Sequence, residues 1–404
     1  MFVSLVLLLA LQRGAEALTP FGEIERLGYD ALQYGLTRLP FAGADVQRVV
    51  VVDISGLPPA DGVTPRKPLE ALITRLADAH PKAVGVDVDF SAEDTREFVT
   101  AADPSFFDTC LRLGVPVFLG VQRRAGRGRD DWLGRSEYAK LAASIVIPRD
   151  AADVSEHGVP GPYPLVVPRL DVRTAREAGH GDDLPSMANA LAVASGRVVQ
   201  PTGDGQPSRI LQRISQRRLD ETHDIDEFAI DYHFVDSVQR IAPNWDTLAL
   251  SAEDKTKVAG SLVLLGDVDK ASDEDRFARP GTTGTVPGVL VHAAAAMTLL
   301  RPLYVFTPQM RAFADIACVA AVLTMLHRRA RRKTRHHRSK SATRRIFSSE
   351  RLATMMKLLV FATVIAGIVL IVRILWFEWI TAIVFAALHA TFEKGTEEIA
   401  EATV

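Results

Sequence analysis

Short apolar runs that end in an acidic residue recur along the first two thirds of this chain and alternate with helical stretches. The runs Val49 to Ile54 and Ala83 to Phe90 carry such an acid, and Val115 to Gln122 is a third apolar run. Between the first two, Pro68 to Ala79 has apolar residues at helical spacing. Strands that are apolar throughout are buried on both faces, and intervening helices favour parallel pairing. The sequence therefore predicts an α/β fold: a layered domain with a mainly parallel sheet covered on both faces.

The remaining elements follow from the same reading of periodicity. Residues 123–159 are rich in Gly, Arg and Asp and predict a long surface loop with one helix. Further helices are expected at Asp103–Leu113, Leu184–Ser195, Ala252–Val258 and Gly288–Leu300, and further strands at Phe228–Phe234 and Ser261–Val268.

Asp53, Asp87 and Asp267 each follow an apolar strand, so the parallel sheet should bring them to one edge. Asp89 lies two residues after Asp87 and is expected on the same strand face. Such carboxylates could form a rim for a divalent cation or a polycation, or could serve as turn and helix-cap residues. The candidate ligand- or cation-binding residues are Asp53, Asp87, Asp89, Asp267, Asp269, Asp273, Asp275 and His292. No particular metal is implied, and His292 also suits a structural role on a packed helix face.

Catalytic motifs are sparse in this chain. It has no serine or cysteine nucleophile signature, no glycine-rich phosphate loop and no zinc spacing, so no catalytic residue or cofactor is predicted. The stretch "VGVDVDFS" resembles the nucleophile motif of the haloacid-dehalogenase family. Ser91 departs from the usual Thr or Val, Asp273 lies too far from Asp267, and no suitable lysine follows. A phosphohydrolase is therefore the third hypothesis, and a non-enzyme is expected.

Three apolar segments near the C-terminus predict transmembrane helices at about 306–326, 355–372 and 379–391. The last segment is short enough to be re-entrant or interfacial instead. Ten Lys or Arg and no acid lie between His327 and Arg345; subtracting them from the net charge of −2 leaves −12 on the rest. Basic loops stay cytoplasmic, which places loop 327–353 inside and residues 40–305 outside. Binding of nucleic acid is not expected, because the loop's position between apolar segments already explains its charge.

The N-terminal 39 residues begin with an apolar run that is either an uncleaved anchor or a signal peptide cut after Ala15-Glu16-Ala17. Cys110 and Cys318 are the only cysteines, and the second lies in a predicted span. A disulfide between them is therefore not expected.

Five blocks in order carry a resemblance: "LGYDALQYGL", "VVVVDIS", "PRKPLEALITRLADAHPKAVGVDVDF", "GSLVLLGDVDKASDEDRF" and "PGVLVHAAAAMTLL". From about Leu27 to Ala390 the chain resembles the CHASE sensor family of the second type, the cyclase and histidine-kinase associated sensory extracellular domain. The resemblance implies an extracytoplasmic α/β sensor framed by an N-terminal helix and usually three C-terminal helices. Family members normally carry an output domain after the last helix, whereas here a short acidic tail, 392–404, follows.

The leading hypothesis is a bacterial multi-pass protein of the inner (plasma) membrane that detects an unknown extracytoplasmic ligand. It would relay the signal through its helices to a separate cytoplasmic or membrane signalling partner, and homo-oligomers are a further expectation. The alternative is a structural or scaffolding membrane protein with the same fold.

Overall fold

The structure is a computed structural model, and the part of the chain that it describes is mainly the predicted outer domain. The described ranges are 48–57, 63–91, 97–122, 132–147, 184–196, 227–269, 275–279 and 284–300, with short pieces at 162–164, 166–167, 215–216, 304–306, 313–314, 316–318, 320–322, 324, 356, 360–367 and 374–375.

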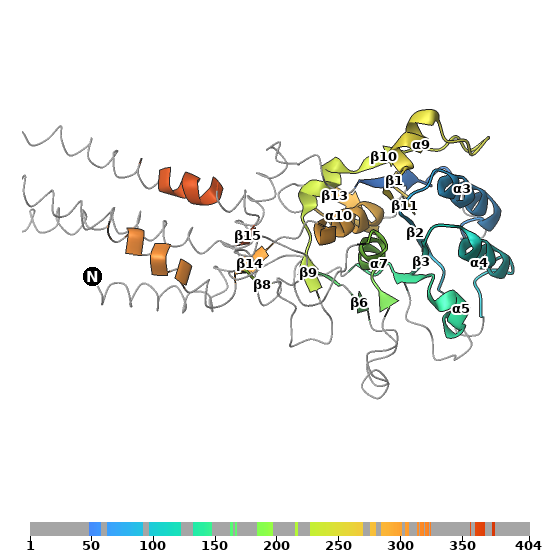
Figure 1. Cartoon of the computed structure of the whole chain (residues 1–404), viewed down its shortest axis with the longest axis horizontal. Coiled ribbons are helices and arrows are strands. Elements are labelled where there is room, and N and C mark those ends of the chain that lie inside the picture. Colours follow the sequence, from blue (N-terminus) through green and yellow to red (C-terminus); the bar gives the residue numbers. More distant parts are fainter. Residues whose placement is uncertain are drawn as a thin grey trace, which may run out of the picture.

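A six-stranded parallel sheet forms the centre of the domain, in the order β10-β1-β11-β2-β3-β4 (Figure 1). Of these six strands, β11 is the last in sequence, and it lies between β1 and β2. The strands are β1 (Val49–Asp53), β2 (Ala83–Asp89), β3 (Val117–Val121), β4 (Ala142–Ser144), β10 (Gln239–Ile241) and β11 (Leu262–Gly266). The prediction of a mainly parallel sheet is confirmed.

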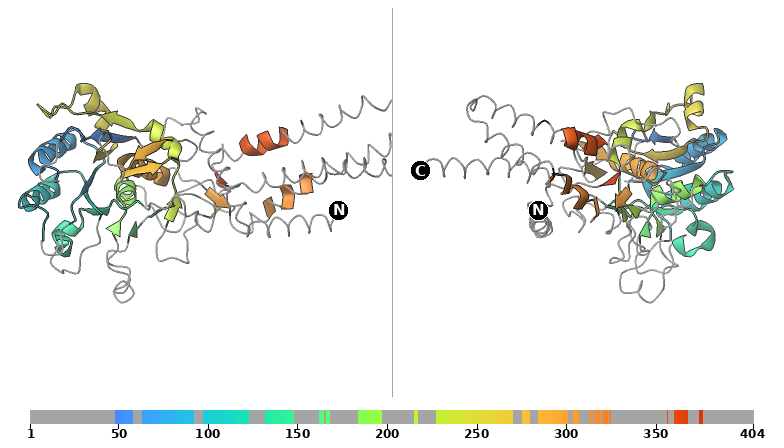
Figure 2. Two further views of the ribbon diagram at one scale, coloured as in Figure 1. Left: turned by 180° about the vertical axis from the view of Figure 1, so that it is seen from behind. Right: turned by 60° about the vertical axis from the view of Figure 1, so that its left-hand side comes forward.

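Helices cover both faces of this sheet, as the apolar strands required. On one face lie α3 (Arg66–Asp78), α4 (Asp103–Arg112) and α5 (Ser136–Ala139), and Val258 of α9 (Ala252–Val258) joins the same core. On the other face lie α7 (Met187–Ala194) and α10 (Gly288–Leu300), an arrangement that the view from behind in Figure 2 also shows. Alternate residues of β1 serve the two cores: Val50 and Val52 face the first, and Val49 and Val51 face the second.

Helix α10 is buried along its whole length, because all thirteen of its residues are buried and those after Gly288 are at most 5% exposed. Its run of four alanines, Ala293 to Ala296, lets it approach the sheet and α7 closely. Gly266 at the end of β11 marks one such contact, since a Cβ atom there would lie 2.5 Å from Cγ2 of Val289. A helix packed on all sides cannot shift without moving its neighbours.

Several predicted boundaries were wrong. Phe228–Phe234 is not one strand: β9 (Glu227–Ala229) ends early, and a 3-10 helix, η3 (Tyr232–Ser237), follows. Residues 184–195 begin as the short strand β7 (Leu184–Pro185), because the Ser186 hydroxyl caps α7 by accepting from Asn189 N at 3.3 Å. The predicted loop 123–159 contains β4, besides η1 (Trp132–Gly134) and α5. Helices Ala252–Val258 and Gly288–Leu300 are confirmed at both ends.

A buried ion pair fixes the start of α3 against α4. Arg66 Nε donates to Asp103 Oδ1 at 2.6 Å, and the two side chains are 3% and 0% exposed. The guanidinium also lies 4.2 Å above the ring centroid of Phe90. Asp103 accepts two further hydrogen bonds, from Thr100 N at 2.9 Å and Thr100 Oγ1 at 2.8 Å. A buried charge of this kind is tolerated because its partner and hydrogen bonds replace water.

Replacing Asp103 by Asn tests this pairing. The change should lower the free energy of unfolding of the full-length protein by about 3–5 kcal/mol, because it leaves the Arg66 charge buried without a counter-ion. Urea denaturation followed by tryptophan fluorescence measures it, and the buried Trp132 reports on this core. The double variant Asp103→Asn with Arg66→Met should lose less stability than the single one. Equal losses would contradict the proposed dependence on charge.

The predicted transmembrane segments lie largely outside the described residues, as do residues 1–39 and 392–404. Within the part of the chain that the structure covers, no helix combines the length and apolar character needed to cross a bilayer. The described pieces beyond residue 312 are short. They nevertheless expose large apolar side chains: Phe313 (66%), Ile316 (43%), Met356 (51%), Val360 (57%) and Val364 (55%).

Candidate functional site

The carboxyl ends of β1, β11 and β2 lie side by side, as predicted, and Asp53 is in register with Gly266. Asp53 is occupied by its own turn. Its Oδ1 accepts from Ser55 N at 2.9 Å and from Val268 N at 3.2 Å, and its Oδ2 accepts from Ser55 Oγ at 2.9 Å. The side chain therefore acts as a turn residue that ties β1 to the loop after β11.

Asp89 has the same role one strand further along. Its Oδ1 accepts from Ser91 N at 2.8 Å and from Gln122 N at 3.2 Å, which links the ends of β2 and β3. Val88 and Phe90 pack toward the α3 and α4 side, so Asp87 and Asp89 do share the opposite strand face. The two carboxylates nevertheless have different environments.

Asp87 points into the interior between β2 and α10. Its side chain is 10% exposed, and its Oδ1 lies 3.7 Å from Nε2 of His292, which is 1% exposed. Asp275, just before β12 (Arg276–Ala278), is close enough to Asp87 for its carboxylate to raise the pKa of Asp87. His292 in turn hydrogen-bonds the backbone of Ile145, after β4. Side chains from β2, from the residue before β12 and from α10 thus meet in one largely buried group, defined here as the Asp87 cluster: Asp87, Asp275 and His292.

Burial moves the two central pKa values in opposite directions. It raises the pKa of Asp87 well above its ordinary value, and the nearby Asp275 carboxylate raises it further. Burial lowers the pKa of His292 to about 3, against the opposing effect of its hydrogen bond to the Ile145 backbone. Although 3.7 Å is within ion-pair distance, burial therefore favours a neutral imidazole beside a carboxyl group that retains its proton.

The other candidate residues are dispersed. Asp267 is half-buried and Asp269 is exposed, whereas Asp273 lies outside the described residues. Among the residues that the structure describes, no group of three His, Cys, Asp or Glu side chains is placed to hold a metal ion. Of the eight candidates, the structure thus gathers three around α10 and commits two, Asp53 and Asp89, to turns.

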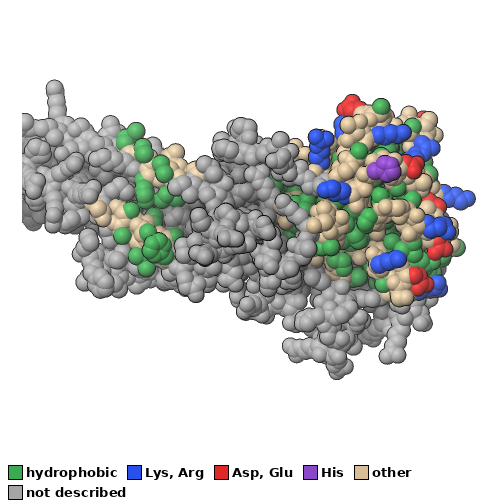
Figure 3. Space-filling view, in the orientation of Figure 1, with side chains coloured by type: hydrophobic (Ala, Val, Ile, Leu, Met, Phe, Trp, Pro, Cys, Tyr) green, Lys and Arg blue, Asp and Glu red, His purple; other side chains and the backbone are tan. Residues whose placement is uncertain are grey.

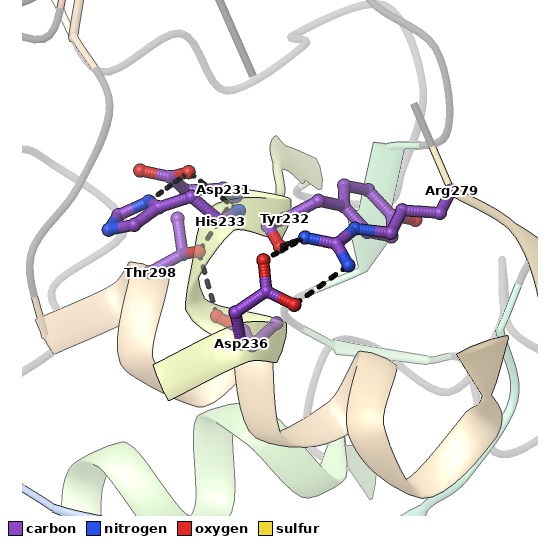
Figure 4. Close-up of polar contacts among 7 residues, drawn as sticks. Asp231, Tyr232, His233, Asp236, Arg279 and Thr298 are labelled. Carbon is purple, nitrogen blue, oxygen red and sulfur yellow. Dashed lines mark hydrogen bonds and ion pairs between the residues drawn. The ribbon is translucent and has the colours of Figure 1, made fainter. Parts of the chain in front are cut away.

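Sequence reasoning missed a second polar group at the other end of α10 (Figure 4). Asp231 is fully buried, its Oδ1 lies 2.5 Å from Nδ1 of His233, and it also accepts from His233 N at 3.2 Å. Asp231 N donates to Thr298 Oγ1 at 2.9 Å, and that hydroxyl donates to Ala294 O at 2.8 Å. Asp231 follows the apolar residues "FAI", the same pattern of strand and acid that singled out Asp53 and Asp87.

Arg279 completes this second group with a bidentate ion pair. Its Nη1 and Nη2 lie 2.9 Å and 2.5 Å from the two carboxylate oxygens of Asp236. The pair joins the end of β12 to η3, as Figure 4 shows beside α10. Bidentate pairs are geometrically specific, so β12 and η3 are held in a fixed relation. Helix α10 is consequently held by polar contacts near both ends.

The positions of Asp87 and Asp89 do not support the phosphohydrolase hypothesis. A carboxylate nucleophile must be ionised, whereas burial favours the protonated form of Asp87. Asp89, which would be the second acid of the motif, accepts two backbone N–H groups.

Comparison with known protein families shows to which family this chain belongs. The CHASE2 domain profile matches residues 2–325, which is most of the chain. The chain belongs to the CHASE2 domain family. CHASE2 is a sensory extracellular domain rather than a catalytic one. No curated protein and no solved structure matches this CHASE2 chain.

Single substitutions in the Asp87 cluster should have opposite effects on pH-dependent stability. Because the folded-state pKa of Asp87 is raised, its contribution falls as pH rises from about 4 through that pKa. Because the folded-state pKa of His292 is lowered to about 3, its contribution falls as pH drops below about 6.5. Relative to the unmodified protein at the same pH, the free energy of unfolding of Asp87→Asn should therefore rise by up to about 1.4 kcal/mol per pH unit between pH 4 and 6.5. That of His292→Gln should fall, relative to the same reference, as pH rises over this range.

Denaturation midpoints across the pH range measure both effects. Exposed Asp246 provides the control, and Asp246→Asn should keep the profile of the unmodified protein. Parallel profiles for Asp87→Asn and His292→Gln would refute the assignment of opposite signs.

Proposed function

We propose that this CHASE2 chain is a membrane-anchored sensor whose domain at 40–305 lies outside the cytoplasm. The Asp87 cluster is its sensory site, flanked by Asp53 and Asp267. Helix α10 is the element that relays the state of that site towards the membrane, and the C-terminal helices carry it further. The family's sensory character supports the first part of this proposal.

The observation that carries the proposal is the position of α10. It contributes His292 to the Asp87 cluster, contacts β1, β11, α7 and η3, and is buried throughout. Its last residue, Leu300, is four positions before β14 (Tyr304–Phe306), which lies on the side of α10 away from the main sheet (Figures 1 and 2). A closely packed helix transmits displacement rather than absorbing it.

Membrane attachment is supported by the contrast between two parts of the surface. Charged side chains of both signs are scattered over the sheet domain in Figure 3, whereas the described C-terminal pieces expose hydrophobic side chains. Five large apolar residues there are at least 43% exposed, and in the sheet domain only Val193 is comparable among the described residues. Apolar surface of this kind is stable against lipid or another protein.

The receiver of the signal is proposed to be a separate cytoplasmic or membrane protein. Loop 327–353, with ten Lys or Arg residues between His327 and Arg345, offers that receiver a cationic contact and also favours anionic lipid on the cytoplasmic side. A purely scaffolding role would require no response of α10 to the state of the Asp87 cluster, and the relay experiment below separates the two functions.

Cysteine labelling tests the topology. In a background carrying Cys110→Ala and Cys318→Ala, a membrane-impermeant maleimide applied to intact spheroplasts should label Asp246→Cys and spare Ser339→Cys. Both positions should react after lysis. Labelling of Ser339→Cys in intact spheroplasts, at the rate seen for Asp246→Cys, would contradict an outer domain with a cytoplasmic basic loop.

Substitution of Gly266 by Ala tests the relay. The added Cβ would lie 2.5 Å from Cγ2 and 2.6 Å from Cβ of Val289, and overpacking of this kind costs about 1–3 kcal/mol. Hydrogen exchange in α10, and in residues 304–306 and 360–367, should rise at least about fivefold. Gly114→Ala is the matched control, since a Cβ there meets nothing within 4 Å. Faster exchange confined to α10 would favour scaffolding over relay.

A further inference from the structure

The packing around Asp87 restricts what can bind there. A Cβ atom added at Gly266 would lie 3.3 Å from Cβ of Asp87 and closer still to Val289. A Cβ at Gly288, the first residue of α10, would collide with the Asp275 carboxylate. His292 is 1% exposed and Asp87 is 10% exposed. Among the described residues, these short distances leave little space beside Asp87 for a polyatomic ligand, whereas a proton needs none.

The ionisable groups around Asp87 come from each element that packs on it. Helix α10 contributes His292, and the residue before β12 contributes Asp275. The neighbouring strand β11 ends at Gly266 and is followed by the half-buried Asp267. The Asp53 carboxylate at the end of β1 is hydrogen-bonded in its own turn. Helix α7 places apolar Met187 and Leu191 over the same face of β2, at Gly85. Asp275 and His292 are thus the ionisable side chains that a change at Asp87 would affect first.

We propose that the stimulus read at the Asp87 cluster is the proton: Asp87 binds it in the closed packing of α10 and releases it when the N-terminal end of α10 loosens from β2. The inference rests on the proposed sensory function and names the ligand of that same site. Release leaves a buried carboxylate facing Asp275, a like charge, across a poorly solvated gap. Rising pH outside the cell therefore favours separation of Asp275 and of the N-terminal end of α10 from the sheet.

The direction of the pKa shifts supports this sign. Burial and Asp275 raise the pKa of Asp87 in the closed form, so the closed form holds the proton more tightly than an opened one. His292 stays neutral over the same range, because burial lowers its pKa to about 3 and it therefore supplies no compensating charge. Each pH unit between the closed and open pKa values of Asp87 changes the opening equilibrium about tenfold.

Two measurements on the full-length protein in lipid nanodiscs test the proposal. Infrared difference spectra recorded between about pH 5 and pH 8 should contain the carbonyl stretch of a protonated carboxylic acid, and Asp87→Asn should remove it. Hydrogen exchange at residues 285–292, corrected for the intrinsic pH dependence, should accelerate at least about tenfold over that interval. In Asp87→Asn the acceleration should fall below about twofold, whereas Asp246→Asn should behave as the unmodified protein does.

Each alternative outcome has a defined meaning. If the carboxylic acid band is unaffected by Asp87→Asn, Asp87 is not the proton site and the inference is overturned. If the band is lost but exchange at 285–292 does not depend on pH, proton binding is not coupled to α10, which also overturns it. Either result leaves the relay tested by Gly266→Ala standing, so the two failures are distinguishable.

A second variant covers the case in which Asp87→Asn does not fold. Asp275→Asn removes the like charge and should move the midpoint of the carboxylic acid band to lower pH. An unchanged midpoint would count against the cluster as the origin of the effect.

Discussion

The complete burial of α10 is the constraint on which the rest of this domain depends. A helix surrounded by protein must find every partner for its polar groups among its neighbours. His292 and Thr298 are the two polar side chains that α10 contributes, and each connects to a different part of the chain. His292 contacts the backbone after β4, while Thr298 contacts the residue that caps η3. The position of one helix therefore determines the relation between the sheet edge and the segments around η3.

Much of this architecture could be predicted from local sequence patterns. The strands β1, β2 and β11 are apolar apart from the aspartates near the ends of β1 and β2, and α10 is bounded by Pro287 and by the Arg301-Pro302 pair, so periodicity and helix-terminating residues sufficed. The edge strands could not be predicted in the same way. β4 is the sequence "AAS" and β10 is "QRI", and neither contains a pattern distinguishable from a loop. Their strand conformation comes from pairing with β3 and β1, which is long-range information.

The sequence predicted where the candidate site lies, at the carboxyl ends of the strands, but not which aspartates belong to it. Asp53, Asp89 and Asp231 all accept the backbone N–H two residues later, from Ser55, Ser91 and His233. An aspartate directly after a strand is therefore most often a turn residue here, and its short local hydrogen bond is the reason. Asp87 differs because its nearest ionisable partners, His292 and Asp275, are about two hundred residues away in sequence. No spacing rule could have identified that group, since only the fold brings it together.

The central place of β11 has a consequence for how the domain is made. β1 and β2 are separated by a single helix in sequence, yet they are not neighbours, because the last strand occupies the gap between them. During synthesis more than 170 residues are added after β2 before β11 (Leu262–Gly266) is available to pair with β1 and β2. Pairing between strands so far apart in sequence is slow. In a nascent chain that ended before β11, β1 and β2 would each have an unpaired edge on the side where β11 pairs with them. Residues of the Asp87 cluster thus meet only after β11 and α10 have been synthesised and the sheet has closed.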